Sequence, residues 1–163
     1  MKLIEAPYYS ELDSPIGLLL LMGDEARLRG LYMRDHEYQR PMAEGCERND
    51  AAFRSVRQQL TAYFAGELRK FEVALAGEGS AFQKKVWQAL LDIPFGETES
   101  YGQLARRIGN EKASRAVGLA NGRNPISIIV PCHRVIGANG SLTGYGGGIE
   151  RKRWLLEHEK RSS

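Results

Sequence analysis

The chain has 163 residues, of which 42% are hydrophobic and 26% are charged, a composition typical of one folded domain or two small ones and unlike that of a disordered chain. Its longest apolar run, LLLLM, is too short to cross a membrane, and the N-terminus lacks the pattern of a signal peptide, so we expect a soluble, cytoplasmic protein. Residues 1–79 carry 10 Lys and Arg against 13 Asp and Glu, whereas residues 80–163 carry 13 against 7. This division of charge indicates either ordinary surface patterning or contact between the second half and a polyanion.

The first predicted elements are strands. One is expected near residues 3–9, and residues 16–22 and 27–33, separated by the turn sequence GDEA, resemble a β-hairpin. A polar loop interrupted by Pro41 and Gly45 follows the hairpin.

A helix is predicted over residues 50–65, with Asn49 or Asp50 as its N-cap. Its apolar residues recur at steps of three and four and predict one buried stripe, made of Phe53, Val56, Leu60 and Phe64. Residues 71–80 predict a short alternating strand that runs into a linker, and we place a domain boundary there.

The second half opens with two capping boxes, SAFQ at residues 80–83 and SYGQ at residues 100–103. In each, the serine caps the helix and the glutamine three residues later bonds back to the cap. The first box begins a helix that ends before Pro94 and buries one face, made of Phe82, Val86, Trp87, Ala89 and Leu90. We therefore divide the chain into an N-terminal α+β domain, residues 1–79, and a C-terminal domain, residues 80–163.

The second box begins a short helix with Tyr101, Leu104, Ala105 and Ile108 on one face, and a further short helix follows with Ala113, Ala116, Val117 and Ala120 on one face. Two such helices predict a helix-turn-helix. The outward face of the second helix carries Arg115 and the small residues Ser114 and Gly118, which suits close approach to DNA, although an αα-hairpin with a solvated arginine fits the same pattern. The predicted fold is α+β: a small N-terminal β-sheet with a helix, packed on an all-helical C-terminal domain that contains the helix-turn-helix.

The cysteines are Cys46 and Cys132, too few for a structural zinc site of three or four thiolates. Cys46 lies in a polar stretch and is interpreted as a loop thiol. Cys132 follows an apolar stretch, residues 128–130, predicted as a buried strand, and is followed directly by His133 and Arg134. A histidine or a cation lowers a thiol pKa, so this segment predicts either a reactive thiolate or a buried structural cysteine.

The sequence IIVPCHRVIG, residues 128–137, resembles the active-site motif of the O6-alkylguanine-DNA alkyltransferases, the methylated-DNA–protein-cysteine methyltransferases. Residues 95–148 resemble the helix-turn-helix, hinge and active-site loops of this family in unbroken order, and RKRWLLEHE, residues 151–159, resembles its C-terminal helix. The first 79 residues match more loosely. Members of an inactive branch carry tryptophan at the cysteine position, and Cys132 places the chain with the active members.

The resemblance implies that Cys132 accepts an alkyl group from O6 of guanine in DNA, once per molecule and without a cofactor. By the family pattern, His133 acts as base on Cys132 through a bridging water, and Glu159 orients His133. Tyr101 serves the guanine ring nitrogen and helps to turn the nucleotide out. Asn124 is the hinge between the recognition helix and the active-site segment.

For the substrate base, the resemblance implies a loop that closes over it and contains Tyr145 and Gly146. Many relatives have a serine at the position of Gly146, so this chain can offer only a backbone N–H there. Main-chain atoms around Cys132 and Val135 read the guanine edge. The DNA-contacting residues implied are Ser100, Ala113, Ser114, Arg115, Gly118 and Arg123. Among these, Arg115 fills the gap left by the extruded base, the small residues allow close contact in the minor groove, and Arg123 strengthens phosphate contact.

We expect no metal and no cofactor, and a monomer whose partner is double-stranded DNA with an alkylated guanine. Cooperative binding of neighbouring copies and acceptance of O4-alkylthymine stay open. Two other functions fit the residues: a thiol hydrolase that uses Cys132 and His133 and regenerates its thiol, and a module that binds DNA lesions without alkyl transfer.

Overall fold

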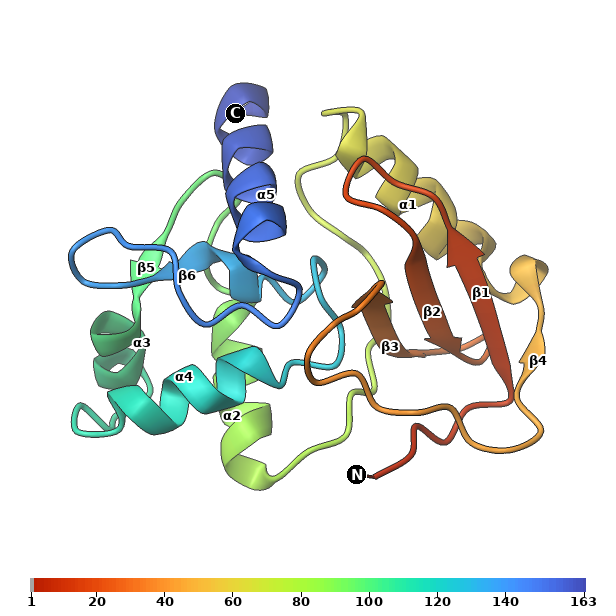
Figure 1. Ribbon diagram of the computed structural model, residues 1–163, viewed down its shortest axis with the longest axis horizontal. Helices are drawn as coiled ribbons and strands as arrows, with labels where there is room; N and C mark the ends of the chain where they lie inside the picture. The colour runs from red at the N-terminus through yellow and green to blue at the C-terminus, as the bar shows by residue number, and fades with distance from the viewer. Residues whose placement is uncertain (1) are drawn as a thin grey trace.

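The computed structural model describes residues 2–163 as two halves that lie side by side, with the segment after α1 running between them (Figure 1). The strands are β1 (Tyr8–Leu12), β2 (Leu19–Gly23), β3 (Leu28–Met33), β4 (Glu47–Arg48), β5 (Glu99–Ser100) and β6 (Val135–Ile136). The α-helices are α1 (Arg54–Phe64), α2 (Ala81–Leu90), α3 (Tyr101–Arg107), α4 (Ser114–Gly122) and α5 (Ile149–Ser162), and the 3-10 turns are η1 (Asp50–Phe53) and η2 (Cys132–Arg134). None of the helices among these residues is long and apolar enough to cross a membrane.

The N-terminal half contains a four-stranded sheet in the order β3-β2-β1-β4, in which only the β1–β4 pair is parallel. The predicted hairpin is confirmed as β2 and β3. The predicted first strand is present, but its bounds, residues 3–9, are wrong: β1 runs from Tyr8 to Leu12, and Ile4 makes only an isolated bridge with Met42. Pro7, just before β1, has no N–H to donate to a ladder.

Helix α1 covers one face of the sheet (Figure 1). The predicted helix at residues 50–65 is entered through the 3-10 turn η1, whose N-cap Asn49 accepts a hydrogen bond from the Ala52 N–H. Tyr63 rather than Phe64 completes the fully buried stripe. The strand predicted in residues 71–80 is reduced to a single bridge between Leu75 and Leu28 of β3.

The C-terminal half places α2, α3, α4 and α5 around a short parallel pair, β5 and β6 (Figure 1). Both predicted capping boxes are present: Ser80 and Ser100 accept from the N–H three residues on, and each glutamine side chain bonds back. The predicted stripe of α4 is wrong in one member, because Ala116 is exposed. Asn121 takes part in the buried face instead, alongside Val117 and Ala120.

Residues 128–130 are buried in a turn and do not form the predicted strand. Ile128 has φ of 72°, a conformation that a β-strand cannot contain. The chain is held just before this turn, because the Leu31 N–H of β3 donates to the Pro125 carbonyl at 2.8 Å and the Ser127 N–H donates to the Leu31 carbonyl at 3.0 Å. A short apolar run indicates burial but does not distinguish a strand from a buried turn. One core cluster contains residues of both halves, so the sheet supports the segment that precedes Cys132.

Candidate active site

Cys132 begins the turn η2, and only 4% of it is exposed. Two asparagine side chains fix its backbone. The Asn124 amide donates to the carbonyls of Ile126 and Val130 and accepts from the Ile126 N–H at 3.0 Å. The Asn121 amide donates to the Cys132 carbonyl at 3.2 Å. Asn124, predicted as a hinge, therefore ties the end of α4 to the turn, and Asn121 carried no signal in the sequence.

Burial raises the pKa of the Cys132 thiol, and the nearby Asn124 amide and Lys152 ammonium oppose this effect. Lys152 is fully buried in α5, and its Nζ donates to the carbonyls of Val135 at 2.5 Å and Thr143 at 2.9 Å. Burial lowers the pKa of Lys152 to about 8. A lysine next to the active segment was missed in the sequence, because lysines on a polar helix are normally solvated.

His133 is fully buried, and its Nε2 lies 2.6 Å from Glu159 Oε2. Its Nδ1 has no hydrogen-bond partner among the described residues. Burial lowers the pKa of His133 against the opposing charge of Glu159. When Nε2 carries the proton toward the carboxylate, Nδ1 is left as a free acceptor, which is the form that a general base needs.

Glu159 is the centre of a buried polar network. Besides His133, its carboxylate accepts from Arg134 Nε at 2.8 Å and from the Tyr63 hydroxyl at 2.6 Å. Burial alone would raise the pKa of Glu159, but His133 and Arg134 outweigh it and hold that pKa well below its usual range. The carboxylate is therefore ionised. Arg134 is adjacent to His133 in the chain, whereas Tyr63 comes from α1 of the other half and had no sequence signal.

Two tyrosines adjoin the thiol. Tyr145 is buried, and its hydroxyl has no partner among the described residues; burial and the nearby Cys132 raise its pKa well above the usual value. The Tyr101 hydroxyl donates to the Thr143 carbonyl at 2.8 Å, and burial raises the pKa of Tyr101. Both phenols are therefore neutral donors at physiological pH.

A pocket of about 500 Å³ lies between α4 and the loops beside it. Its lining comprises Glu37, Tyr38, Tyr101, Ser114, Arg115, Gly118, Leu119, Gly122, Thr143 and Gly144. Gly118 faces the Tyr101 ring, because a Cβ there would lie 3.7 Å from that ring. The exposed Arg115 and Ser114 are at the start of α4, and Leu119 is 61% exposed. The helix thus offers small and apolar residues beside one arginine.

The other predicted residues lie near this pocket in different surroundings. The Ser100 hydroxyl caps α3 by accepting from the Gln103 N–H at 3.1 Å. Ala113 is half-buried at the start of α4. The Arg123 guanidinium lies 4.7 Å from the centre of the Tyr38 ring. Gly146 is covered by His36, because a Cβ there would come within 2.3 Å of the imidazole.

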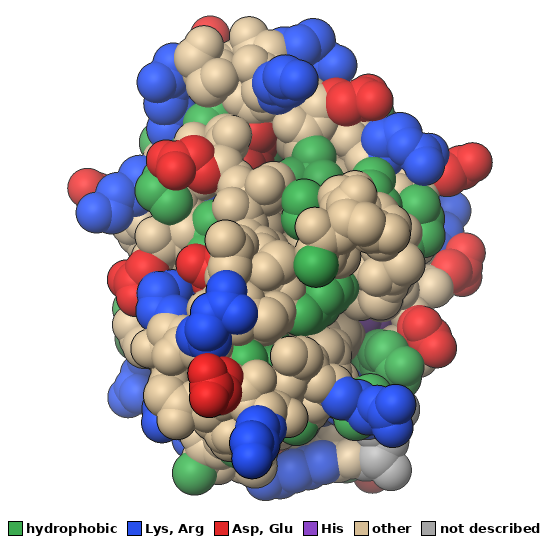
Figure 2. Space-filling model, turned by 90° about the vertical axis from the view of Figure 1, so that its left-hand side faces the viewer, with side chains coloured by type: hydrophobic (Ala, Val, Ile, Leu, Met, Phe, Trp, Pro, Cys, Tyr) green, Lys and Arg blue, Asp and Glu red, His purple; other side chains and the backbone are tan. Residues whose placement is uncertain are grey.

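Figure 2 shows the face of the molecule that lies on the left in Figure 1, the side of α3 and the loop before Thr143. Blue and red side chains are interspersed there, with green and tan surface between them, and no continuous basic field appears. On this face the cationic side chains thus lie in small groups. Among residues 2–163, no three His, Cys, Asp or Glu side chains are grouped so that they could hold a metal ion.

Fold and site together define a protein that presents a buried cysteine, backed by a histidine–glutamate–arginine network, next to a helix-turn-helix. The chain belongs to the 6-O-methylguanine DNA methyltransferase family: residues 7–76 match the model of its ribonuclease-like domain, and residues 81–161 match the model of its DNA binding domain.

Named relatives agree with this membership. The chain is 55% identical over 152 residues to a methylated-DNA–protein-cysteine methyltransferase of Methanosarcina acetivorans. This match covers 93% of this chain and 97% of the relative. It is 56% identical over 155 residues to one of Mycolicibacterium paratuberculosis, covering 95% and 93%. The crystal structure of Mycobacterium tuberculosis OGT in complex with DNA superimposes with a TM-score of 0.92 at 56% identity, covering 96% of this chain and 94% of that one. These comparisons confirm the predicted family and the α+β fold.

Proposed function

We propose that the chain repairs alkylated DNA by direct reversal: it moves a methyl or other alkyl group from O6 of guanine to Cys132. Membership of a family of methylated-DNA–protein-cysteine methyltransferases supports this activity and DNA as partner. The observation that carries the assignment to this residue is a buried thiol followed in the chain by a buried histidine that is paired with an ionised glutamate.

In the proposed step, the Cys132 sulfur attacks the alkyl carbon, a carbon–sulfur bond forms and the bond from that carbon to guanine O6 breaks. The thiol proton passes through a water to the free Nδ1 of His133, whose resulting charge is stabilised by Glu159 at 2.6 Å. Tyr101 supplies hydrogen-bond donation to the leaving guanine as negative charge develops on it. Because the thioether has no leaving group that water can displace readily, each molecule reacts once.

For the substrate base, we assign the backbone around Val135, the Tyr145 side chain and the Gly146 N–H as contacts to the extruded guanine. Lys152 supports this assignment, because it bonds the carbonyls of Val135 and Thr143 and so holds the two segments together. Asn124 fixes the position of Cys132 relative to α4, because its amide donates to the Val130 carbonyl just before Pro131 and Cys132.

For DNA, we assign α4 as the inserted helix and Arg115 as the residue that takes the place of the extruded base. Ala113, Ser114 and Gly118 give the helix its small surface, and Ser100 and Arg123 lie close enough to its ends to meet phosphates through backbone or side-chain donors. We also propose that the two domains divide between residues 79 and 80, that the chain is a monomer and that it acts in the cytoplasm. A reduced Cys132 is required for the reaction, and the cytoplasm maintains reduced thiols.

The test is incubation of the chain with a duplex that holds one O6-methylguanine, followed by intact mass and peptide mapping. We expect a gain of one methylene on the Cys132 peptide in a one-to-one ratio with repaired guanine. Cys132→Ala removes this gain and retains DNA binding. Repair with a recovered free thiol would indicate a hydrolase, and lesion binding by the wild-type protein without a mass gain would indicate a binding module; either result contradicts the proposal.

A further inference from the structure

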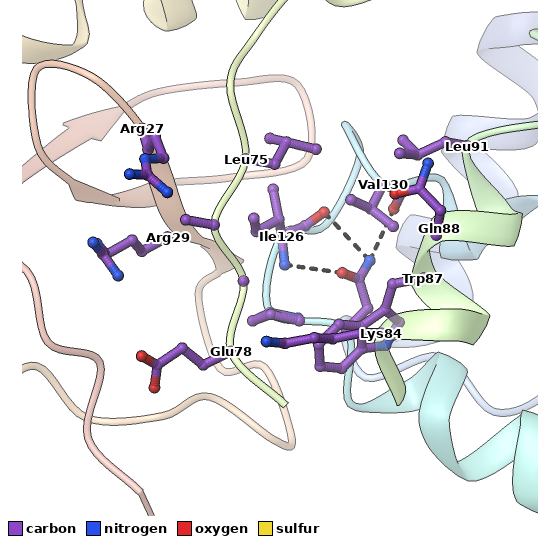
Figure 3. A pocket seen from close by; sticks show the side chains of 14 residues that line it. Arg27, Arg29, Leu75, Glu78, Lys84, Trp87, Gln88, Leu91, Ile126 and Val130 are labelled. Carbon is purple, nitrogen blue, oxygen red and sulfur yellow. Dashed lines mark hydrogen bonds between the residues drawn. The ribbon is translucent and has the colours of Figure 1, made fainter. Parts of the chain in front are cut away.

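A second cleft, of about 420 Å³, lies between the edge of β3 and α2, away from the pocket at α4. Figure 3 shows Arg27 and Arg29 on the strand side of this cleft and Lys84 and Trp87 on the helix side. Cys132 is absent from its lining, and the proposed repair reaction makes no use of the cations there.

The middle of the cleft is largely apolar, and its aromatic ring is anchored by a hydrogen bond. Leu75, Ile126 and Val130 lie between the two sides in Figure 3. The Trp87 ring is held in place because its Nε1 donates to the Ala120 carbonyl at 2.8 Å. A volume of this size accommodates one or two fused rings with a substituent, and an apolar, largely preformed lining is typical of small-molecule sites.

The strand side carries cationic groups that are incompletely paired. Arg29 is the extra residue of a β-bulge, since Gly30 pairs with Met22 and Leu28 pairs with Gly23; bulges commonly re-aim a side chain. The Arg29 Nε is buried and has no hydrogen-bond partner among the described residues, and its nearest carboxylate, Asp24, is 3.9 Å away.

The remaining charges favour an anion. Arg27 and Lys84 are exposed lining residues, and neither forms an ion pair with a described residue. Glu78 is the acidic member of the lining, and its carboxylate is paired with Lys2 at 3.2 Å. Three cations thus surround a largely apolar floor, and the one carboxylate of the lining is already paired with Lys2.

We propose that this cleft binds a small organic anion in which a phosphate, sulfonate or carboxylate is attached to a flat apolar ring system. The acidic group lies against Arg29 and Arg27, and the ring lies between Trp87 and the side chains of Ile126 and Val130. This chemistry occurs both in nucleotides and in simple aromatic acids.

The two tryptophans provide a direct test on the full chain. Trp87 lines the cleft, whereas Trp154 belongs to α5 and packs against the rings of Phe64 and His158. In a two-dimensional ¹H–¹⁵N spectrum, titration with 1-naphthyl phosphate is expected to shift the indole N–H signal of Trp87 saturably, with a Kd on the order of 0.1–1 mM, and to leave that of Trp154 in place. Inorganic phosphate and 2-naphthol, each carrying half of the chemistry, are expected to bind about tenfold more weakly.

Deoxyadenosine monophosphate forms a second arm that distinguishes a nucleotide from a simple aromatic acid. Arg29→Gln and Arg27→Gln are each expected to weaken binding of the ringed anions about tenfold. Arg27 is exposed and outside the core, so its replacement is expected to leave the fold intact. The matched control Arg54→Gln, an exposed arginine on α1, is expected to bind like wild type.

Saturable binding of either ringed anion that depends on Arg27 and Arg29 supports the site. The proposal is overturned if neither anion shifts Trp87, if both arginine variants bind like Arg54→Gln, or if both indole signals move together. Displacement of 1-naphthyl phosphate by an undamaged DNA duplex would also overturn it, because the cations would then serve DNA. None of these readouts depends on alkyl transfer, so failure of the site and failure of the proposed repair activity are distinguishable.

Discussion

Replacement of Glu159 by Gln tests the polar network behind Cys132. The substitution keeps the shape of the side chain and removes its charge. The carboxylate accepts four kinds of donor, from His133, Arg134, Tyr63 and the Gly96 N–H, and only 1% of it is exposed. A neutral amide cannot accept from all of them, because its NH₂ group is itself a donor.

The expected loss of stability follows from the charge that remains. Arg134 is 7% exposed, and its Nε and Nη2 both bond to Glu159, at 2.8 and 3.1 Å. Removing one partner of such a buried pair costs about 3–5 kcal/mol, because the other charge stays desolvated. That is a large part of the stability of a typical domain, about 5–15 kcal/mol. Removal of the orienting charge is also expected to slow alkyl transfer about 10²-fold, since His133 becomes a weaker base.

The pH dependence gives an independent check. The folded protein holds the pKa of Glu159 below its ordinary value of 4.5. The stabilisation by the ionised carboxylate is therefore complete above this ordinary value and declines as the pH falls below it, where the unfolded chain takes up the proton first. The difference in free energy of unfolding between wild type and Glu159→Gln is expected to be constant at neutral pH and to shrink below about pH 4.5.

Urea unfolding, followed by circular dichroism between pH 3 and pH 8, measures this difference, and methyl transfer from an O6-methylguanine duplex measures the rate. The matched control is Glu157→Gln, which removes an exposed carboxylate two residues earlier on α5. We expect the control to match wild type in both measurements. If Glu159→Gln were as stable as the control, or reacted as fast, the role given to this network would be refuted.

Three further substitutions test separate parts of the site. Tyr63→Phe removes the 2.6 Å hydrogen bond to Glu159 and is expected to cost about 1–3 kcal/mol, seen as a fall in Tm of about 2–4 °C per kcal/mol; an unchanged Tm would mean that the bond contributes nothing. Lys152→Met removes a cation that lowers the pKa of Cys132, so the rate of thiol alkylation at pH 7 is expected to fall. The difference in rate between the variant and wild type is expected to narrow above about pH 8, where Lys152 of the wild type loses its proton. A rate difference that is the same at all pH values would contradict this effect. Arg115→Ala is expected to slow repair of duplex DNA while reaction with free O6-methylguanine base stays the same, and equal losses on both substrates would contradict its role in base extrusion.

The local signals in the sequence were sufficient for much of the C-terminal half. The capping boxes at Ser80 and Ser100 fix where α2 and α3 begin, because cap and helix are only three residues apart and bond to each other wherever the helix lies. The motif around Cys132 and His133 is equally local, and with it the sequence predicted the family that the comparisons confirm.

Tertiary structure decided how the thiol is held and what surrounds it. Residues 128–130 have the composition of a strand, yet they form a turn. The Asn124 amide donates to the Val130 carbonyl at the end of this turn, and Leu31 of β3 bonds Pro125 and Ser127 just before it. Tyr63 contacts Glu159, 96 positions away in the chain. The buried Lys152 ammonium is satisfied by the carbonyls of Val135 and Thr143, which the fold brings to it. Such contacts depend on which side chains the folded chain brings together, and neither periodicity nor capping carries that information. Sequence alone therefore predicted where most helices begin and which cysteine is the candidate nucleophile, whereas packing between the two halves set the electrostatic surroundings of that thiol.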